Sequence, residues 1–109
     1  MSQTDFSYEF TTNIEEPDEQ MGIYAEASLL ELAEGHTDMI GAAVTIEELT
    51  GAETPHSYRA RIVVYMRPRN TVAEEKDDNP MAALQKALAI IERQIRENRD
   101  KLRERWKQP

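Results

Sequence analysis

Basic residues gather near the end of this 109-residue sequence, and their types and spacing favour the binding of phosphate groups. The segment Glu92–Lys107 holds seven basic and four acidic residues. At helical spacing, one flank carries Arg96, Arg99, Arg103 and Lys107 with Arg93 next to them, while Lys101 and Arg105 lie on the other side. Arginine predominates, and its planar guanidinium matches the geometry of phosphate. A solvated helix with ion pairs such as Glu92–Arg96 would produce the same pattern, so spacing alone leaves both interpretations open.

A second basic group belongs to the segment Tyr58–Arg67, where Arg59, Arg61 and Arg67 alternate with apolar residues and so share one face of a strand. The net charge of −8 by itself disfavours a polyanion as partner. However, residues 1–56 carry thirteen acidic and no basic side chains, whereas residues 57–109 carry thirteen basic and eight acidic ones. This division indicates one surface that binds anions and another that avoids them, or else an acidic half that is merely solvated.

Catalytic and cofactor chemistry find little support in the sequence. His36 and His56 both fall in predicted loops, without a nucleophile or acceptor at a telling spacing. The paired glutamates lack the alternating oxygen ligands of a calcium loop, the four glycines are isolated, and cysteine is absent. We therefore expect no enzyme activity, no metal site and no cofactor. The first thirty residues contain neither a basic residue nor a long apolar run, which predicts a cytoplasmic protein with no membrane partner.

The N-terminal half predicts a strand, a helix and a second strand. Residues 6–14 alternate in polarity, and residues 17–35 follow helical spacing from Pro17 to a stop at Gly35. The apolar face of this helix is expected to hold Met21, Tyr24, Ala25, Leu29 and Leu32. Residues 39–49 read as the next strand, with its inward positions at Ile40, Ala42, Val44 and Ile46.

The C-terminal half predicts two more strands and a long helix. Tyr58–Arg67 forms the third strand and Thr71–Glu75 a short fourth one. Asp77–Asn79 offers a helix N-cap and Pro80 suits the first helical position, so the last helix should run from about Met81 to near Trp106. Its apolar seam comprises Leu84, Leu88, Ile91, Ile95 and Leu102, together with Asn98 and Trp106, and its final turns are expected to extend past the domain body.

The order of elements predicts an α+β fold in a single domain over residues 1–109. The sequence β-α-β-β-β-α gives a four-stranded sheet, with hairpin-connected antiparallel strands and both helices packed on one face. The helices must share a face because each has an apolar stripe that needs cover. This architecture would place the long basic helix beside the sheet.

The stretch Asp78–Arg103 resembles the closing helix of the ribosome hibernation-promoting factors and ribosome-associated inhibitors, the family of sigma-factor modulation proteins. In that family an acidic turn leads into an Ala-Ala-aliphatic start, an aliphatic–x–Arg–Gln–aliphatic core and a basic tail. The matching residues here are Ala82, Ala83, Leu84, Ile91, Arg93, Gln94, Ile95, Arg99, Asp100, Lys101, Leu102 and Arg103. The segments YRARIVVYMRP and TVAEE also resemble the third and fourth strands of the family.

The resemblance implies a non-enzymatic inhibitor of translation that binds the small ribosomal subunit, in the channel for messenger and transfer RNA, under stress. It implies that Arg93, Arg99, Lys101 and Arg103 contact phosphates of ribosomal RNA, with no small-molecule substrate. The charge pattern adds Arg96, Lys107, Arg59 and Arg61 as candidates. The sequence departs from the family in the segment 17–35, which has five acidic and no basic residues. The alternative is a diverged module of the same fold that binds a basic protein or forms a homodimer.

Overall fold

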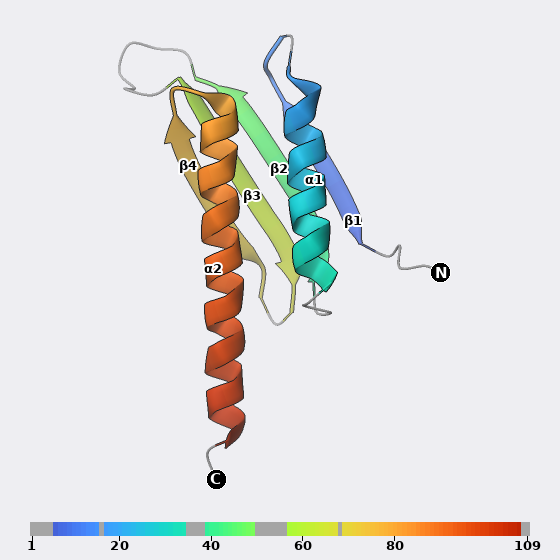
Figure 1. Cartoon of the computed structure of the whole chain (residues 1–109), viewed down its shortest axis with the longest axis vertical. Helices are drawn as coiled ribbons and strands as arrows, with labels where there is room; N and C mark the ends of the chain where they lie inside the picture. The colour runs from blue at the N-terminus through green and yellow to red at the C-terminus, as the bar shows by residue number, and fades with distance from the viewer. Residues whose placement is uncertain (1–5, 16, 35–38, 50–56, 68, 108–109) are drawn as a thin grey trace.

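The structure, a computed structural model, describes residues 6–15, 17–34, 39–49, 57–67 and 69–107, with side chains described as far as Asn98 (Figure 1). The elements follow in the order β1 (Ser7–Thr12), α1 (Glu19–Glu34), β2 (Met39–Glu48), β3 (Tyr58–Met66), β4 (Thr71–Asp77) and α2 (Pro80–Lys107). The predicted α+β fold and its β-α-β-β-β-α order are confirmed. His36 and His56 lie outside the described residues.

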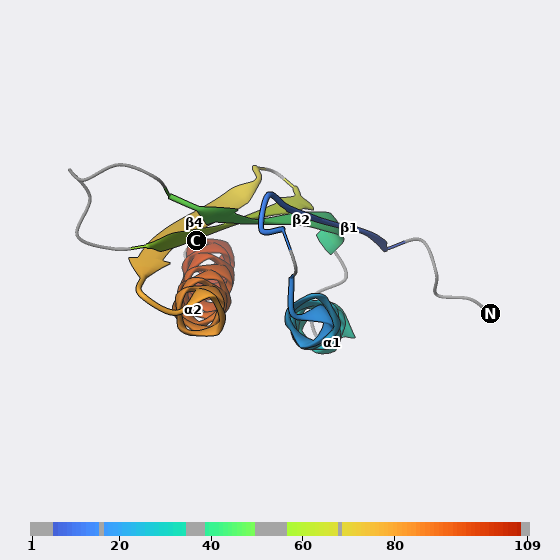
Figure 2. The same ribbon diagram turned by 90° about the horizontal axis from the view of Figure 1, so that it is seen from above.

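The four strands form one mixed sheet in the order β1-β2-β3-β4. The pairs β2–β3 and β3–β4 are antiparallel, as expected of strands joined by short connections. The pair β1–β2 is parallel, because α1 carries the chain back along the sheet before β2 begins. Both helices lie on the same face, so no helix of the described residues covers the other face of the sheet (Figure 2).

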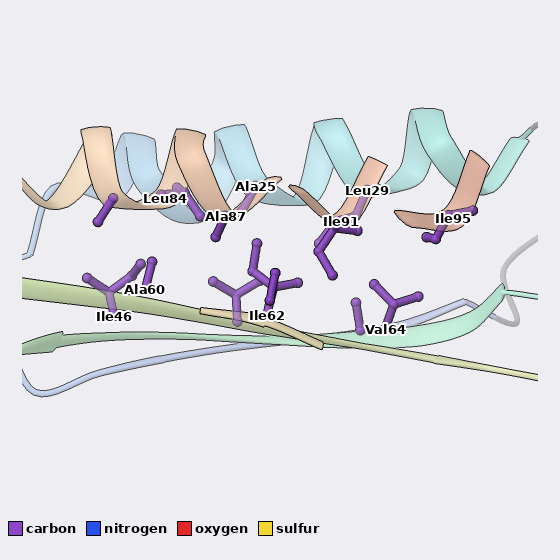
Figure 3. Packing of buried hydrophobic residues seen from close by; sticks show 14 of the residues in the cluster. Ala25, Leu29, Ile46, Ala60, Ile62, Val64, Leu84, Ala87, Ile91 and Ile95 are labelled. Carbon is purple, nitrogen blue, oxygen red and sulfur yellow. The ribbon is translucent and has the colours of Figure 1, made fainter. Parts of the chain in front are cut away.

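The core lies between the sheet and the two helices. Figure 3 shows the apolar side chains of both helices pointing toward those of the central strands. The fully buried set includes Met21, Ala25 and Leu29 of α1, Ala83, Leu84, Ala87, Ile91 and Ile95 of α2, and Ala42, Val44, Ile46, Ala60, Ile62 and Val64 of the sheet. The seam predicted for the last helix is therefore confirmed at Leu84, Ile91 and Ile95.

Two apolar residues that the pattern placed inward are exposed. Ile40 is 52% exposed, because the β2–β3 register shifts between Met39 and Gly41 and turns Met39 inward instead. Tyr24 is 42% exposed, since it lies at the margin of the apolar face of α1 and not at its centre. The other positions predicted to face inward are buried, both in α1 (Met21, Ala25 and Leu29) and in β2 (Ala42, Val44 and Ile46). Leu32 of α1 is half-buried.

Polar side chains cap the N-terminal ends of both helices. Helix α1 begins at Glu19, two residues later than predicted, because the Asp18 carboxylate accepts the Gln20 backbone N–H at 2.9 Å and acts as the N-cap. Helix α2 begins as predicted, with the Asn79 side-chain oxygen accepting the Ala82 backbone N–H at 3.0 Å and Pro80 at the first position. These caps fix the residue at which each helix begins.

Candidate nucleic-acid interface

The described part of the predicted basic flank is exposed on α2. Arg93 is solvent-exposed, and the Arg96 side chain is 67% exposed while its Nη2 lies 2.7 Å from the Glu92 Oε2. This i,i+4 ion pair is one of those that the solvated-helix interpretation predicts, and it partly neutralises Arg96. Exposed pairs of this kind are weak, and a phosphate could compete for the guanidinium.

Helix α2 continues well past the end of the sheet (Figure 1). Ile95 is buried, whereas the next three residues, Arg96, Glu97 and Asn98, are all exposed. Asn98 was predicted on the apolar seam, but at this point the helix has left the sheet that would cover it. The helix then runs on to Lys107, so the twelve residues from Arg96 project about 18 Å at helical rise.

We call Arg93–Lys107 the basic arm. Four predicted contacts, Arg99, Lys101, Arg103 and Lys107, belong to its final turns, where the structure describes the helical backbone only. A helical backbone fixes their spacing along the arm, and the sheet does not reach this part of α2 (Figure 1). The helical backbone of the arm after Ile95 thus lies beyond the sheet.

Arg59 and Arg61 lie on the face of the sheet opposite the helices, apart from the basic arm. The Arg59 guanidinium is held by two carboxylates, with its Nε 2.8 Å from the Glu47 Oε1 and its Nη1 3.7 Å from the Glu74 Oε2. The hydrogen bond to Glu47 raises the pKa of Arg59. Arg61 is exposed on the same face, next to this cluster. The structure therefore divides the predicted residues into two groups. Arg59 and Arg61 lie on the open face of the sheet, and the others belong to α2, on the opposite side of the sheet.

The turn between β3 and β4 adds basic residues that the sequence interpretation left out of the site. Arg67 and Arg69 are both exposed in this turn. The turn lies at the end of the sheet past which α2 projects (Figure 1). Only the pairing of β3 with β4 and the packing of α2 beneath them bring this turn near the arm, and no local pattern signals that arrangement.

Between the two helices lies a groove of about 450 Å³. Its lining includes Tyr24, Glu31 and Leu32 from α1 and Leu88, Glu92 and Arg96 from α2. Two carboxylates against one paired arginine make the groove a poor site for an anion. Among the described residues, no three His, Asp or Glu side chains cluster in a way that could hold a metal ion.

Comparisons with known proteins agree with this architecture. The family model described as "Sigma 54 modulation protein / S30EA ribosomal protein" matches residues 8–103. No curated protein sequence matches the chain. The N-terminal domain of Protein Y from Thermus thermophilus is similar in structure, with a TM-score of 0.63 and 24% identity, covering 83% of this chain and 93% of that one.

A ribosomal subunit interface protein from Coxiella burnetii is also similar in structure, with a TM-score of 0.70 and 8% identity. The match covers 86% of this chain and 98% of that one. At these identities the two structures establish a shared fold. Among the described helices, none is long and apolar enough to cross a membrane.

Proposed function

The chain belongs to the family of sigma 54 modulation proteins and S30EA ribosomal proteins, and we propose that it inhibits translation by binding the small ribosomal subunit through the basic arm of α2. Membership in this family makes it a ribosome-associated binding protein and not an enzyme. The finer proposal is that Arg93, Arg96 and the basic residues of the last turns bind ribosomal RNA phosphates in the channel for messenger and transfer RNA. This role places the chain in the cytoplasm.

One observation carries the proposal: α2 continues past the sheet (Figure 1), and Arg93 and Arg96, the described basic residues of its arm, are exposed. A helical rod that stands clear of the body can enter a groove lined by RNA, where contacts to phosphate and ribose need no reading of bases. Arg67 and Arg69 at the adjacent sheet end extend the same positive surface. Arg59 is already bound by Glu47 and Glu74, so it contributes less to phosphate binding than the arm.

The test is co-sedimentation of the purified chain with small ribosomal subunits over a range of salt concentrations. If about five phosphates are contacted, affinity should fall with a logarithmic slope of about −0.7 to −0.9 per contact, which is roughly tenfold for each doubling of salt. Binding that is stoichiometric at low salt and steeply salt-dependent supports the proposal. Absence of binding at low salt would refute it and favour the interaction module without RNA binding.

A pair of matched variants locates the contact. Arg99→Glu with Arg103→Glu reverses two charges of the basic arm and should abolish co-sedimentation without unfolding the chain, since the arm lies beyond the sheet. Lys76→Glu with Lys86→Glu makes the same change in net charge at the other end of β4 and the first turns of α2. Lys86→Glu also breaks the exposed ion pair with Asp77, so circular dichroism must first show that this variant is folded; it should then bind normally. Equal losses in both variants would mean that overall charge, and not the arm, governs binding.

A further inference from the structure

Helix α1 has a second apolar face that points away from the core. Its inner face contributes Met21, Ala25 and Leu29, all buried. On the opposite side, Ile23 and Leu30 are 60% and 42% exposed, and Ala27 between them is exposed as well. The spacing 23, 27 and 30 is i, i+4 and i+7, so these three side chains form one continuous stripe along the helix. We call it the outer stripe.

Carboxylates surround the outer stripe. Glu19 and Glu26 lie along one side of it at helical spacing, Glu31 lies on the other side, and Glu34 continues it toward the end of the helix. All four are exposed, and α1 contains no basic residue. The field of this face is therefore negative over its whole length, and it would repel both RNA and an anionic membrane surface.

We propose that the outer stripe of α1 binds a lysine- and arginine-rich amphipathic segment of a protein of the small ribosomal subunit. This inference rests on the proposed ribosome binding, because it assigns a partner to the side of the chain that the RNA cannot cover. Apolar anchors at i, i+4 and i+7 fit the apolar side of such a segment. The surrounding glutamates are complementary to its basic side chains, so the apolar stripe and the acidic residues around it both favour the same kind of partner.

The proposal also accounts for the uneven charge of the chain. An acidic helix facing ribosomal RNA would oppose the attraction of the basic arm. If that helix instead contacts a basic protein segment, both charged surfaces contribute to the same complex. Solubility alone would explain the glutamates of this helix, but it would not explain the exposed apolar stripe beside them. Binding to an amphipathic segment explains both.

Site-specific cross-linking tests this placement. The chain contains no cysteine, so Ala27→Cys creates a single thiol in the middle of the outer stripe. A benzophenone maleimide attached there should cross-link the bound chain to a ribosomal protein. A product with ribosomal RNA, a product with a second copy of this chain, or no product would each overturn the inference.

A second label separates this inference from the proposed function. Ala89→Cys is exposed on α2, one helical turn before Arg93, and the same reagent there should form a product with the subunit whenever the arm is bound. If the Ala89→Cys label gives a product with the subunit but the Ala27→Cys label gives none with a ribosomal protein, the inferred contact of α1 is wrong and the proposed ribosome binding stands. Failure to co-sediment at all would remove both.

Affinity gives an independent readout. Ile23→Ser with Leu30→Ser removes the two large anchors from a surface that the fold does not need, and should raise the dissociation constant for small subunits about tenfold. The salt slope should stay the same, because no phosphate contact is lost. Ile40→Ser with Val72→Ser makes a comparable change on the open face of the sheet and should leave affinity unchanged. An unchanged dissociation constant in the α1 variant would overturn the inference.

Discussion

Two glycines should respond in opposite directions to the same substitution. An alanine Cβ at Gly41 of β2 would lie 2.8 Å from the backbone oxygen of Ser7 and 3.3 Å from its Cβ. Ordinary contact begins at 3.4 Å, and the obstacle is backbone, so β1 must move by about 0.6 Å. Ser7 is paired with Gly41 in the parallel register, and the shift would disturb the pairing of this edge strand.

The cost of such overpacking is about 1–3 kcal/mol, while the loss of glycine flexibility in the unfolded chain returns about 0.4–1 kcal/mol. We therefore expect Gly41→Ala to lower the free energy of unfolding by about 1–2 kcal/mol, and the melting temperature by roughly 5–10 °C. At Gly22 of α1, the three nearest neighbours of the added Cβ would all be atoms of the Phe10 ring, the first at 3.6 Å, which is ordinary van der Waals contact. Gly22→Ala should instead raise stability by about 0.5–1 kcal/mol, because alanine favours the helix.

Urea denaturation followed by circular dichroism measures both variants under one condition. The comparison controls for the change in residue type, since each variant gains a single methyl group. If Gly41→Ala were as stable as the unaltered chain, the close approach of β1 and β2 at Ser7 would be wrong. If both variants lost stability equally, the argument from local space would fail.

Three further predictions concern single side chains. Arg93→Glu should weaken small-subunit binding and reduce its salt slope by about one contact, whereas Lys76→Glu should change neither, as measured by co-sedimentation. Lys86 holds the pKa of the Asp77 carboxyl below its ordinary value. The ion pair between the two therefore stabilises the fold above about pH 4, and this contribution is lost as the pH falls through the lowered pKa. Asp77→Asn should flatten the acid limb of a plot of unfolding free energy against pH; an unchanged limb would contradict the pairing. Burial raises the pKa of Tyr8 to about 12, so Tyr8→Phe should remove a phenol that ionises near pH 12 from an ultraviolet titration. The same variant should cost about 1 kcal/mol of stability, because it loses the 3.0 Å hydrogen bond that the Tyr8 hydroxyl donates to the Gly22 carbonyl.

Much of the fold followed from the sequence because its signals are local. The alternation in β3 and the seam of α2 reflect one-sided burial, and Asn79 with Pro80 marks a helix start through bonds within four residues. The parallel pairing of β1 with β2 was not predicted, and it depends on the path of α1 across the sheet. Ile40 was misplaced because a register shift in β2 depends on how β3 pairs with it.

The candidate site was less predictable than the fold. The basic spacing of α2 could be read directly, but the freedom of each arginine depends on neighbours distant in sequence. Arg59 is bound by carboxylates from β2 and β4, which only the sheet register brings together. The outer stripe of α1 was not predicted either, because helical spacing assigns one apolar face to the core and gives no role to apolar residues on the opposite face.

The extension of α2 past the sheet has a consequence for how such a protein can evolve. Among the described side chains of α2, Ile95 is the last that is buried in the core, whereas the proposed binding surface lies mostly beyond it. Substitutions in the last turns can therefore change affinity with little effect on folding, and core substitutions can change stability without touching the ligand. The strength of binding and the stability of the fold can then evolve separately.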